Sequence, residues 1–198
     1  MMKKSVYQLL DQYNGNLSWN QINDAGIARN TIYRMLKSGE LEQVYRGLFI
    51  GSSDFEDTNF LLQQRFEKGI LSHESALALH DLSNVLPEKV HFSFPQGYHL
   101  NKKVLEEIPI DAHYVKAEYH LLGMIYVKSV LGNELRMYNK ERTLCDVWNP
   151  WSRTLSEYKI EAVKNYMQMK DRDIPKLLKY MNYLPVDKEL DSYIQALV

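Results

Sequence analysis

The stretch GIARNTIYRMLKSGELEQVYRGLFIG, residues 26–51, decides how the chain is interpreted. Its apolar residues first recur at helical spacing, which predicts a helix over about residues 29–38 that ends at Gly39. The segments LEQVY and GLFI then predict two short strands on either side of a turn at Arg46 and Gly47. The stretch therefore predicts a helix followed by a small hairpin.

Two shorter helices are predicted before this stretch. Apolar residues at helical spacing over residues 6–13 indicate the first of them. Ser18 and Gln21 have the spacing of a capping box, which marks the start of the second, and Gly26 suits the left-handed position that ends it. Three helices and a hairpin within residues 1–51 are the parts of a winged helix-turn-helix DNA-binding domain.

One face of the third predicted helix carries polar side chains that can read DNA. Asn30, Arg34 and Lys37 follow the i, i+4, i+7 spacing that places them on one stripe, and Thr31 lies beside it. Arginine can bind guanine through two hydrogen bonds, asparagine can do the same with adenine, and threonine can contact the methyl group of thymine. The predicted DNA-binding residues are Arg29, Asn30, Thr31, Arg34, Lys37 and Arg46.

The same polar stripe is also compatible with an ordinary solvated helix face. Arg29 stands near the helix start, where it is either a phosphate contact or a surface charge, and Arg46 at the hairpin tip is within reach of a phosphate. Lys3 and Lys4 are further candidates for contacts with the DNA backbone. The ordered set of capping box, glycine turn, polar stripe and hairpin favours DNA binding over a solvated surface.

The composition limits the class of protein. The chain has 198 residues and a net charge of −1, so its whole surface is not a general attractor for nucleic acid. The first fifty residues nevertheless carry six Lys and Arg against four Asp and Glu. The single cysteine, Cys145, excludes an internal disulfide and fits a reducing compartment. With no signal peptide and no apolar run of about 20 residues, we expect a soluble cytoplasmic protein.

The segment SSDFEDT, residues 52–58, is small, polar and acidic, and it is the predicted linker between two domains. The whole chain is predicted to be α+β and mostly helical, with the winged helix-turn-helix first. A mixed α/β domain over residues 59–198, ending in a helical bundle, is predicted to follow. Predicted helices of this domain cover about residues 59–68, 72–80, 140–149, 155–169, 173–182 and 186–197, and predicted strands cover about 90–94, 111–115 and 124–130.

Three segments resemble the AbiEi family, the antitoxins of AbiE-type toxin–antitoxin systems, which are encoded beside a nucleotidyltransferase-like toxin. Residues 26–50 resemble the winged-helix signature of that family. LSHESALALHDLS, residues 71–83, is similar to the helix that starts its second domain, and YNKERTLCDVW, residues 138–148, is similar to its Glu-Arg-Thr-Leu-x-Asp segment. Ala28 departs from the pattern, because family members often have a serine there that can cap the helix.

The resemblance implies two roles for the protein. The first domain would repress its own operon by binding inverted-repeat promoter DNA. The second domain would neutralise the toxin of a type IV system for abortive infection, a form of phage defence, without necessarily forming a stable complex with that toxin. Because no heptad stripe predicts a constitutive zipper dimer, we expect a monomer in solution that pairs on DNA.

Arg142 and Asp146 form the candidate antitoxin patch of the second domain. They are i, i+4 neighbours within the predicted helix over about residues 140–149. The simpler interpretation is an ion pair on the helix surface or between domains, worth only a few tenths of a kcal/mol when exposed. The alternative is a functional surface through which the antitoxin acts.

No catalytic residue, metal-ligand set or cofactor site is predicted, and we expect the protein not to be an enzyme. The nine glycines form no phosphate-binding loop, and the six histidines lack the spacing of the common metal motifs. Glu157 and Lys159 could complete a nuclease motif with Asp111 or Asp146, but such motifs need a strand where a helix is predicted. A ligand-responsive winged-helix transcription factor without antitoxin activity and a DNA-tethered nuclease or kinase are the alternatives.

Overall fold

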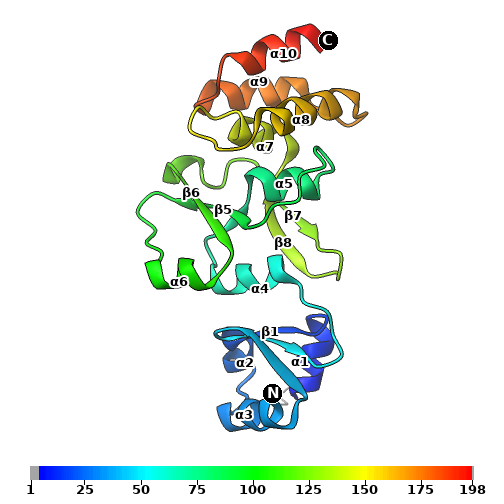
Figure 1. Ribbon diagram of the computed structural model, residues 1–198, viewed down its shortest axis with the longest axis vertical. Coiled ribbons are helices and arrows are strands. Elements are labelled where there is room, and N and C mark those ends of the chain that lie inside the picture. The colour runs from blue at the N-terminus through cyan, green and yellow to red at the C-terminus, as the bar shows by residue number, and fades with distance from the viewer. Residues whose placement is uncertain (1–4, 198) are drawn as a thin grey trace. The chain divides into compact units, whose positions relative to one another are not determined.

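The computed structural model describes residues 5–197, so the candidate contacts Lys3 and Lys4 lie outside the described residues. The chain divides into two compact units, each made of two segments. Figure 1 labels the helices and strands and colours the chain from blue at the N-terminus to red at the C-terminus. The first unit consists of the chain up to Lys68 together with Tyr126–Leu135, and the second consists of Gly69–Ile125 together with the chain from Arg136 onward.

The first unit contains the helices and the hairpin that the sequence predicts. Its elements are α1 (Val6–Gln12), β1 (Asn16–Ser18), α2 (Trp19–Asp24), α3 (Arg29–Ser38), β2 (Leu41–Tyr45), β3 (Leu48–Gly51) and α4 (Thr58–Arg65). The strands form a sheet in the order β1-β3-β2, with antiparallel neighbours. Strand β1 was not predicted, because so short a strand shows no alternation of apolar and polar residues.

Local capping signals fix where the helices of this unit begin and end. The Ser18 side chain accepts a hydrogen bond from the Gln21 backbone N–H, and Gln21 Oε1 accepts one from the Ser18 backbone N–H, so the predicted capping box is confirmed. Gly26 has a φ of 69°, the left-handed conformation predicted for it, and Gly39, predicted to end the third helix, also has a left-handed φ of 76°. Helix α3 begins after Ala28, which offers no side-chain cap.

The apolar side chains of these helices and strands form a buried core. Helix α3 contributes Ile32 and Met35, which are 0% and 4% exposed, so its apolar stripe is the face that packs. The opposite face of α3 is therefore left on the surface of the unit. The core consists of Val6, Leu9, Leu17, Ile22, Ile32, Met35, Leu41 and Phe49.

The predicted linker 52–58 is in part a packed portion of the first unit. Asp57 is buried, its backbone N–H donates to Asn16 Oδ1 over 2.8 Å, and its side chain caps α4. The second carboxylate oxygen of Asp57 accepts hydrogen bonds from Ser129 and from Asn133 Nδ2. At least one polar residue of this segment thus makes hydrogen bonds inside the first unit, so the segment is not only a solvated linker.

From Ile70 onward the chain forms a mixed sheet and a group of helices. The sheet has the order β6-β5-β4-β8-β7, in which β5 runs parallel to β6 and β4 runs parallel to β8. Strands β4 and β5 are antiparallel. The elements are β4 (Ile70–Leu71), α5 (His73–Leu79), β5 (Val90–Pro95), α6 (Lys102–Glu107), β6 (Ile110–Val115), a 3₁₀ helix (Ala117–Tyr119), β7 (Met124–Lys128), β8 (Glu134–Tyr138), α7 (Lys140–Val147), α8 (Ser156–Gln168), α9 (Ile174–Tyr183) and α10 (Glu189–Leu197).

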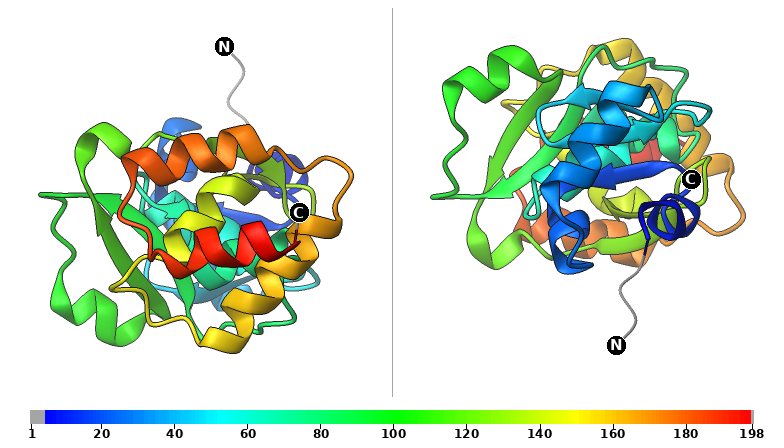
Figure 2. Two further views of the ribbon diagram at one scale, coloured as in Figure 1. Left: turned by 90° about the horizontal axis from the view of Figure 1, so that it is seen from above. Right: turned by 90° about the horizontal axis from the view of Figure 1, so that it is seen from below.

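Helix α7 is the centre of the predicted helical bundle. It packs against α5, α8 and α9, and α10 packs against α8 (Figure 2). Cys145 of α7 is 1% exposed, and burial raises the pKa of its thiol, so it is a core side chain. The shared core includes Leu77, Leu144, Val147, Val163, Tyr166, Leu177, Leu190 and Ile194.

The described residues 5–197 combine ten α-helices with two β-sheets, so the prediction that the chain mixes helices and strands is confirmed. Each predicted helix and strand has a counterpart at nearly the predicted position. In this same part of the chain, none of the helices has the length and apolar character needed to cross a bilayer.

Candidate nucleic-acid interface

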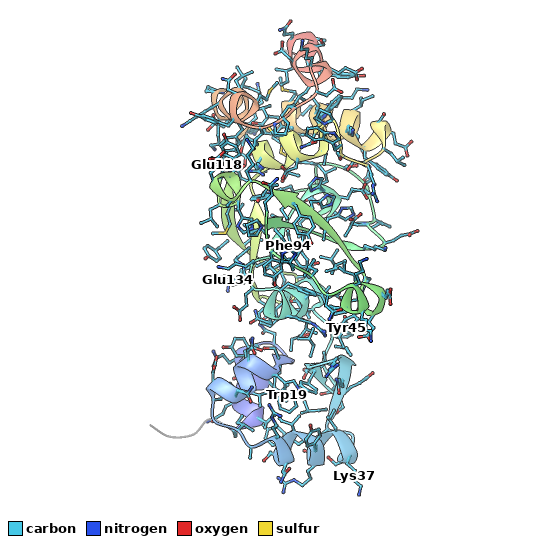
Figure 3. The ribbon with its side chains drawn as sticks, turned by 90° about the vertical axis from the view of Figure 1, so that its left-hand side faces the viewer. Trp19, Lys37, Tyr45, Phe94, Glu118 and Glu134 are labelled. Carbon is cyan, nitrogen blue, oxygen red and sulfur yellow. The ribbon has the colours of Figure 1, made fainter. Side chains whose placement is uncertain are left out.

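Helix α3 presents the predicted polar stripe to solvent. Asn30, Arg34 and Lys37 are exposed, while Ile32 and Met35 on the other side of the helix are buried in the core. Lys37 points away from the body of the first unit (Figure 3). The stripe therefore combines long cationic and amide side chains on a helix that is fixed from behind by its apolar face, as base-reading helices require.

The start of α3 is a second cationic part of this face. Arg29 is exposed, and its guanidinium carbon lies 5.6 Å from the centroid of the Trp19 ring, a cation–π contact that orients it. Thr31 is half-buried in the same turn. Because Ala28 does not cap the helix, the N–H groups of the first turn keep their partial positive charge, which favours an anion such as a phosphate.

The turn between β2 and β3 carries exposed Arg46 and is held from two sides. The Trp19 backbone N–H donates to the Gly47 carbonyl over 3.0 Å, and Arg65 Nη1 donates to the Arg46 carbonyl over 2.7 Å. Gly47 has a φ of 82°, and a Cβ there would lie 2.9 Å from Trp19 Cδ1, so only glycine fits without strain. Arg46 thus projects from a turn whose backbone is fixed.

Two features of this face were not predicted from the sequence. Tyr33 is 56% exposed, lies one helical turn from both Arg29 and Lys37, and places its ring 6.2 Å from that of Trp19. Its spacing from Arg29 and Lys37 was the available signal, but an aromatic residue in a helix is more often part of the core. Tyr33 adds an aromatic surface between two cationic side chains.

The second unpredicted feature is the carboxylate of Glu40, just beyond the end of α3. Glu40 accepts hydrogen bonds from Ser38 Oγ and from the Tyr7 hydroxyl, and these hydrogen bonds lower the pKa of its carboxyl. Together with Tyr7, Thr31 and Arg34 it lines a cavity of about 530 Å³. The charge of Glu40 near Arg34 makes this part of the surface less favourable for an anion such as phosphate.

Arg142 and Asp146, the candidate antitoxin patch, are buried within the second unit. Arg142 is 0% exposed and Asp146 is 5% exposed, and Arg142 Nε donates to Asp146 Oδ1 over 2.9 Å. Arg142 Nη1 also donates to the carbonyls of Tyr119 and Leu122, over 2.8 and 3.2 Å. The interpretation of an exposed ion pair is therefore wrong: the pair is buried because α7 lies inside the bundle and local carbonyls accept from the guanidinium.

The neighbours of this pair are also buried polar groups. Tyr166 donates from its hydroxyl to Glu141 Oε1 over 3.0 Å, and Thr143 Oγ1 donates to the Asn139 carbonyl over 2.9 Å. Burial raises the pKa of Asp146, and Arg142 opposes this shift. The polar side chains of this segment thus connect α7 to the elements around it. Whether the segment also serves antitoxin activity stays a prediction.

Comparisons with known proteins address the first unit most directly. Among curated proteins, no sequence matches the chain. Among solved structures, the crystal structure of the RV2827C protein from Mycobacterium tuberculosis has a TM-score of 0.57 and 13% sequence identity, covering 86% of this chain and 67% of that chain. At that identity the similarity shows the fold alone. The family described as transcriptional regulator, AbiEi antitoxin, matches residues 5–50. Over this segment the resemblance to the AbiEi family is confirmed.

Proposed function

We propose that the protein is the antitoxin of an AbiE-type, type IV toxin–antitoxin system and the repressor of its own operon. The observation that carries this proposal is the exposed polar stripe of α3, inside the segment that matches AbiEi antitoxin regulators. Its partners would be promoter DNA and a nucleotidyltransferase-like toxin, both in the cytoplasm. The role would be regulatory, since the matching family is one of regulators and not a class of enzymes.

The first unit would act as a winged helix-turn-helix. Helix α3 would enter the major groove with Asn30 and Arg34 at the base edges, and Thr31 would approach a thymine methyl group. Arg29 and Arg46 would bind phosphates on either side, because one is fixed on Trp19 and the other projects from the hairpin turn. An inverted repeat would take one protomer on each half-site, paired by the DNA.

The domain after the predicted linker, residues 59–198, would neutralise the toxin. This part of the proposal rests on the family resemblance of segments 71–83 and 138–148. The test is to express the neighbouring nucleotidyltransferase-like gene with and without this protein, from independent promoters, and to score growth. Restored growth supports the proposal, whereas equal toxicity at equal protein levels contradicts it.

A cavity in the second unit supports a second candidate function, a ligand-responsive winged-helix transcription factor. The cavity has a volume of about 600 Å³, and its lining includes Arg142, Trp151 and Tyr183. For this function, a small molecule bound in the cavity would have to change the affinity of the protein for its operator. The protein itself would have no effect on toxin activity. The growth experiment separates the two functions, because only the antitoxin restores growth.

Replacing Arg34 with alanine should weaken operator binding by about 1–3 kcal/mol, roughly 5- to 150-fold, and relax selectivity at particular base pairs. The reason is that an exposed arginine on the reading helix can make two hydrogen bonds to guanine. Electrophoretic mobility shifts on the operator and on single-base variants measure both effects. Lys68→Ala, which removes an exposed charge after α4, is the matched control. Unchanged affinity and selectivity for Arg34→Ala would exclude α3 as the reader.

Replacing Arg46 with alanine should weaken binding to operator and to random DNA by similar factors. The plot of log affinity against log salt concentration should become shallower by about 1, because one phosphate contact is lost. Fluorescence anisotropy at several salt concentrations measures this slope. A loss of specificity at an unchanged slope would instead show that Arg46 enters a groove and reads bases.

A further inference from the structure

Two histidines and a carboxylate converge on one face of the sheet in the second unit. His91 lies on β5, and Asp111 and His113 lie on β6. Strands β5 and β6 run parallel with His91 opposite Asp111, and residues two apart on a strand share a face, so the register brings these side chains together. One potential ligand atom from each of the three residues lies within 4.8 Å of the others.

The distance between the two imidazoles fits a shared metal ion. His91 Nδ1 and His113 Nε2 are 3.0 Å apart. A tetrahedral zinc ion, with zinc–nitrogen distances of about 2.0–2.1 Å, would hold two imidazole nitrogens about 3.3 Å apart. A shift of a few tenths of an ångström would therefore convert the observed pair into a chelate.

The surroundings orient both rings. His91 Nε2 lies 3.7 Å from Glu74 Oε2, so a carboxylate faces the ring nitrogen that points away from His113, as in carboxylate–histidine–metal arrangements. His73 stacks on His113 with 3.5 Å between ring centroids. His73 is 5% exposed and has a φ of 47°, a left-handed conformation that is uncommon for residues other than glycine.

Both imidazoles are suited to donate a lone pair. Burial lowers the pKa of His113 to about 4 and also lowers the pKa of His91. The hydrogen bond between His91 Nδ1 and His113 Nε2 needs a lone pair on one of these two nitrogens, so at least one of the rings is neutral, the form that binds metals.

We propose that His91, Asp111 and His113 bind a divalent transition-metal ion of the zinc class. Two imidazole nitrogens and one carboxylate oxygen suit zinc or its neighbours, whereas magnesium and calcium favour oxygen ligands throughout. The two proposed roles, operator binding and toxin neutralisation, do not involve a metal ion. A metal site would therefore be an additional function of the protein.

Three protein ligands leave a fourth coordination position for a water molecule or a small anion. Asp111 and His113 line a cavity of about 260 Å³, whose wall also includes Ser152 and Arg153. The cavity provides room for that fourth ligand, and the arginine favours an anionic one. The site would thus be one that exchanges a ligand, unlike a closed structural zinc site.

The test uses the untagged full-length protein after treatment with a chelator, titrated with zinc chloride by isothermal titration calorimetry. One zinc ion should bind per chain, and His91→Ala and His113→Ala should each weaken binding at least about 100-fold, more than the loss of an orienting residue costs. Glu74→Gln should weaken it about 10-fold, because it removes only the orienting carboxylate. His99→Ala removes an exposed histidine and should bind zinc as the parent does.

Cobalt chloride gives a readout that does not depend on any variant. The parent protein should develop the strong visible absorption of tetrahedral cobalt with nitrogen ligands, and zinc should displace it. Circular dichroism identifies any variant that fails to fold. In that case the cobalt spectrum of the parent protein decides whether the metal site exists. No zinc binding at 1:1 stoichiometry by the parent, or folded His91→Ala and His113→Ala that bind like the parent, would overturn the proposal.

Discussion

Replacing Arg142 with alanine should lower the free energy of unfolding by about 3–5 kcal/mol, the loss typical of breaking a buried ion pair. Arg142 is 0% exposed, and without it the Asp146 carboxylate would be left charged in the core. The carbonyls of Tyr119 and Leu122 would each lose the hydrogen bond from the guanidinium as well. Urea unfolding of the full chain, followed by circular dichroism, measures the loss.

A matched control exists on the same helix. Lys140 lies 2.7 Å from Asp171, whose side chain is 73% exposed, so Lys140→Ala should cost less than about 1 kcal/mol. Arg142→Lys keeps the charge but not the planar donor group that reaches three acceptors. Its loss in free energy of unfolding should therefore lie between those of Lys140→Ala and Arg142→Ala. An Arg142→Ala protein that is as stable as the parent yet fails to counter the toxin would contradict the structural role and restore Arg142 as a functional residue.

The elements predicted best are those that local signals define. The capping box of Ser18 and Gln21 and the left-handed glycines Gly26 and Gly39 act within a few residues, so the first unit could be outlined from the sequence. Strands β4 and β8 were missed, because Leu71 pairs with Met137, far away in the sequence. Short strands of this kind are defined by their partners and not by their own pattern.

The candidate sites also differ in how much of each could be predicted from local sequence patterns. The stripe of Asn30, Arg34 and Lys37 follows from helical spacing alone, and the structure places these side chains on the surface. The spacing of Arg142 and Asp146 predicted their contact but not their burial, which depends on how α7 packs. The histidine cluster depends on the register between two strands, which no spacing within one segment reveals.

The double substitution Arg34→Ala with Lys37→Ala should abolish measurable operator binding, by more than about 100-fold, and leave toxin neutralisation intact. In the proposed complex each side chain would make a separate contact with DNA, and a base contact is worth about 1–3 kcal/mol. Both residues are exposed, so the free energy of unfolding should change by only about 0.5 kcal/mol per site. Mobility shifts measure operator binding, and growth in the presence of the toxin measures neutralisation.

The growth experiment needs a control for changes in transcription. Toxin and antitoxin must be expressed from independent promoters, because loss of repression would otherwise raise both proteins and hide a change in neutralisation. Truncation of the first unit is a weaker test, since Asp57 joins residues on both sides of the predicted boundary and removal of either side would disturb its hydrogen bonds. A double variant that is folded and abundant but no longer protects cells would show that neutralisation runs through α3, and the two roles would then share one surface.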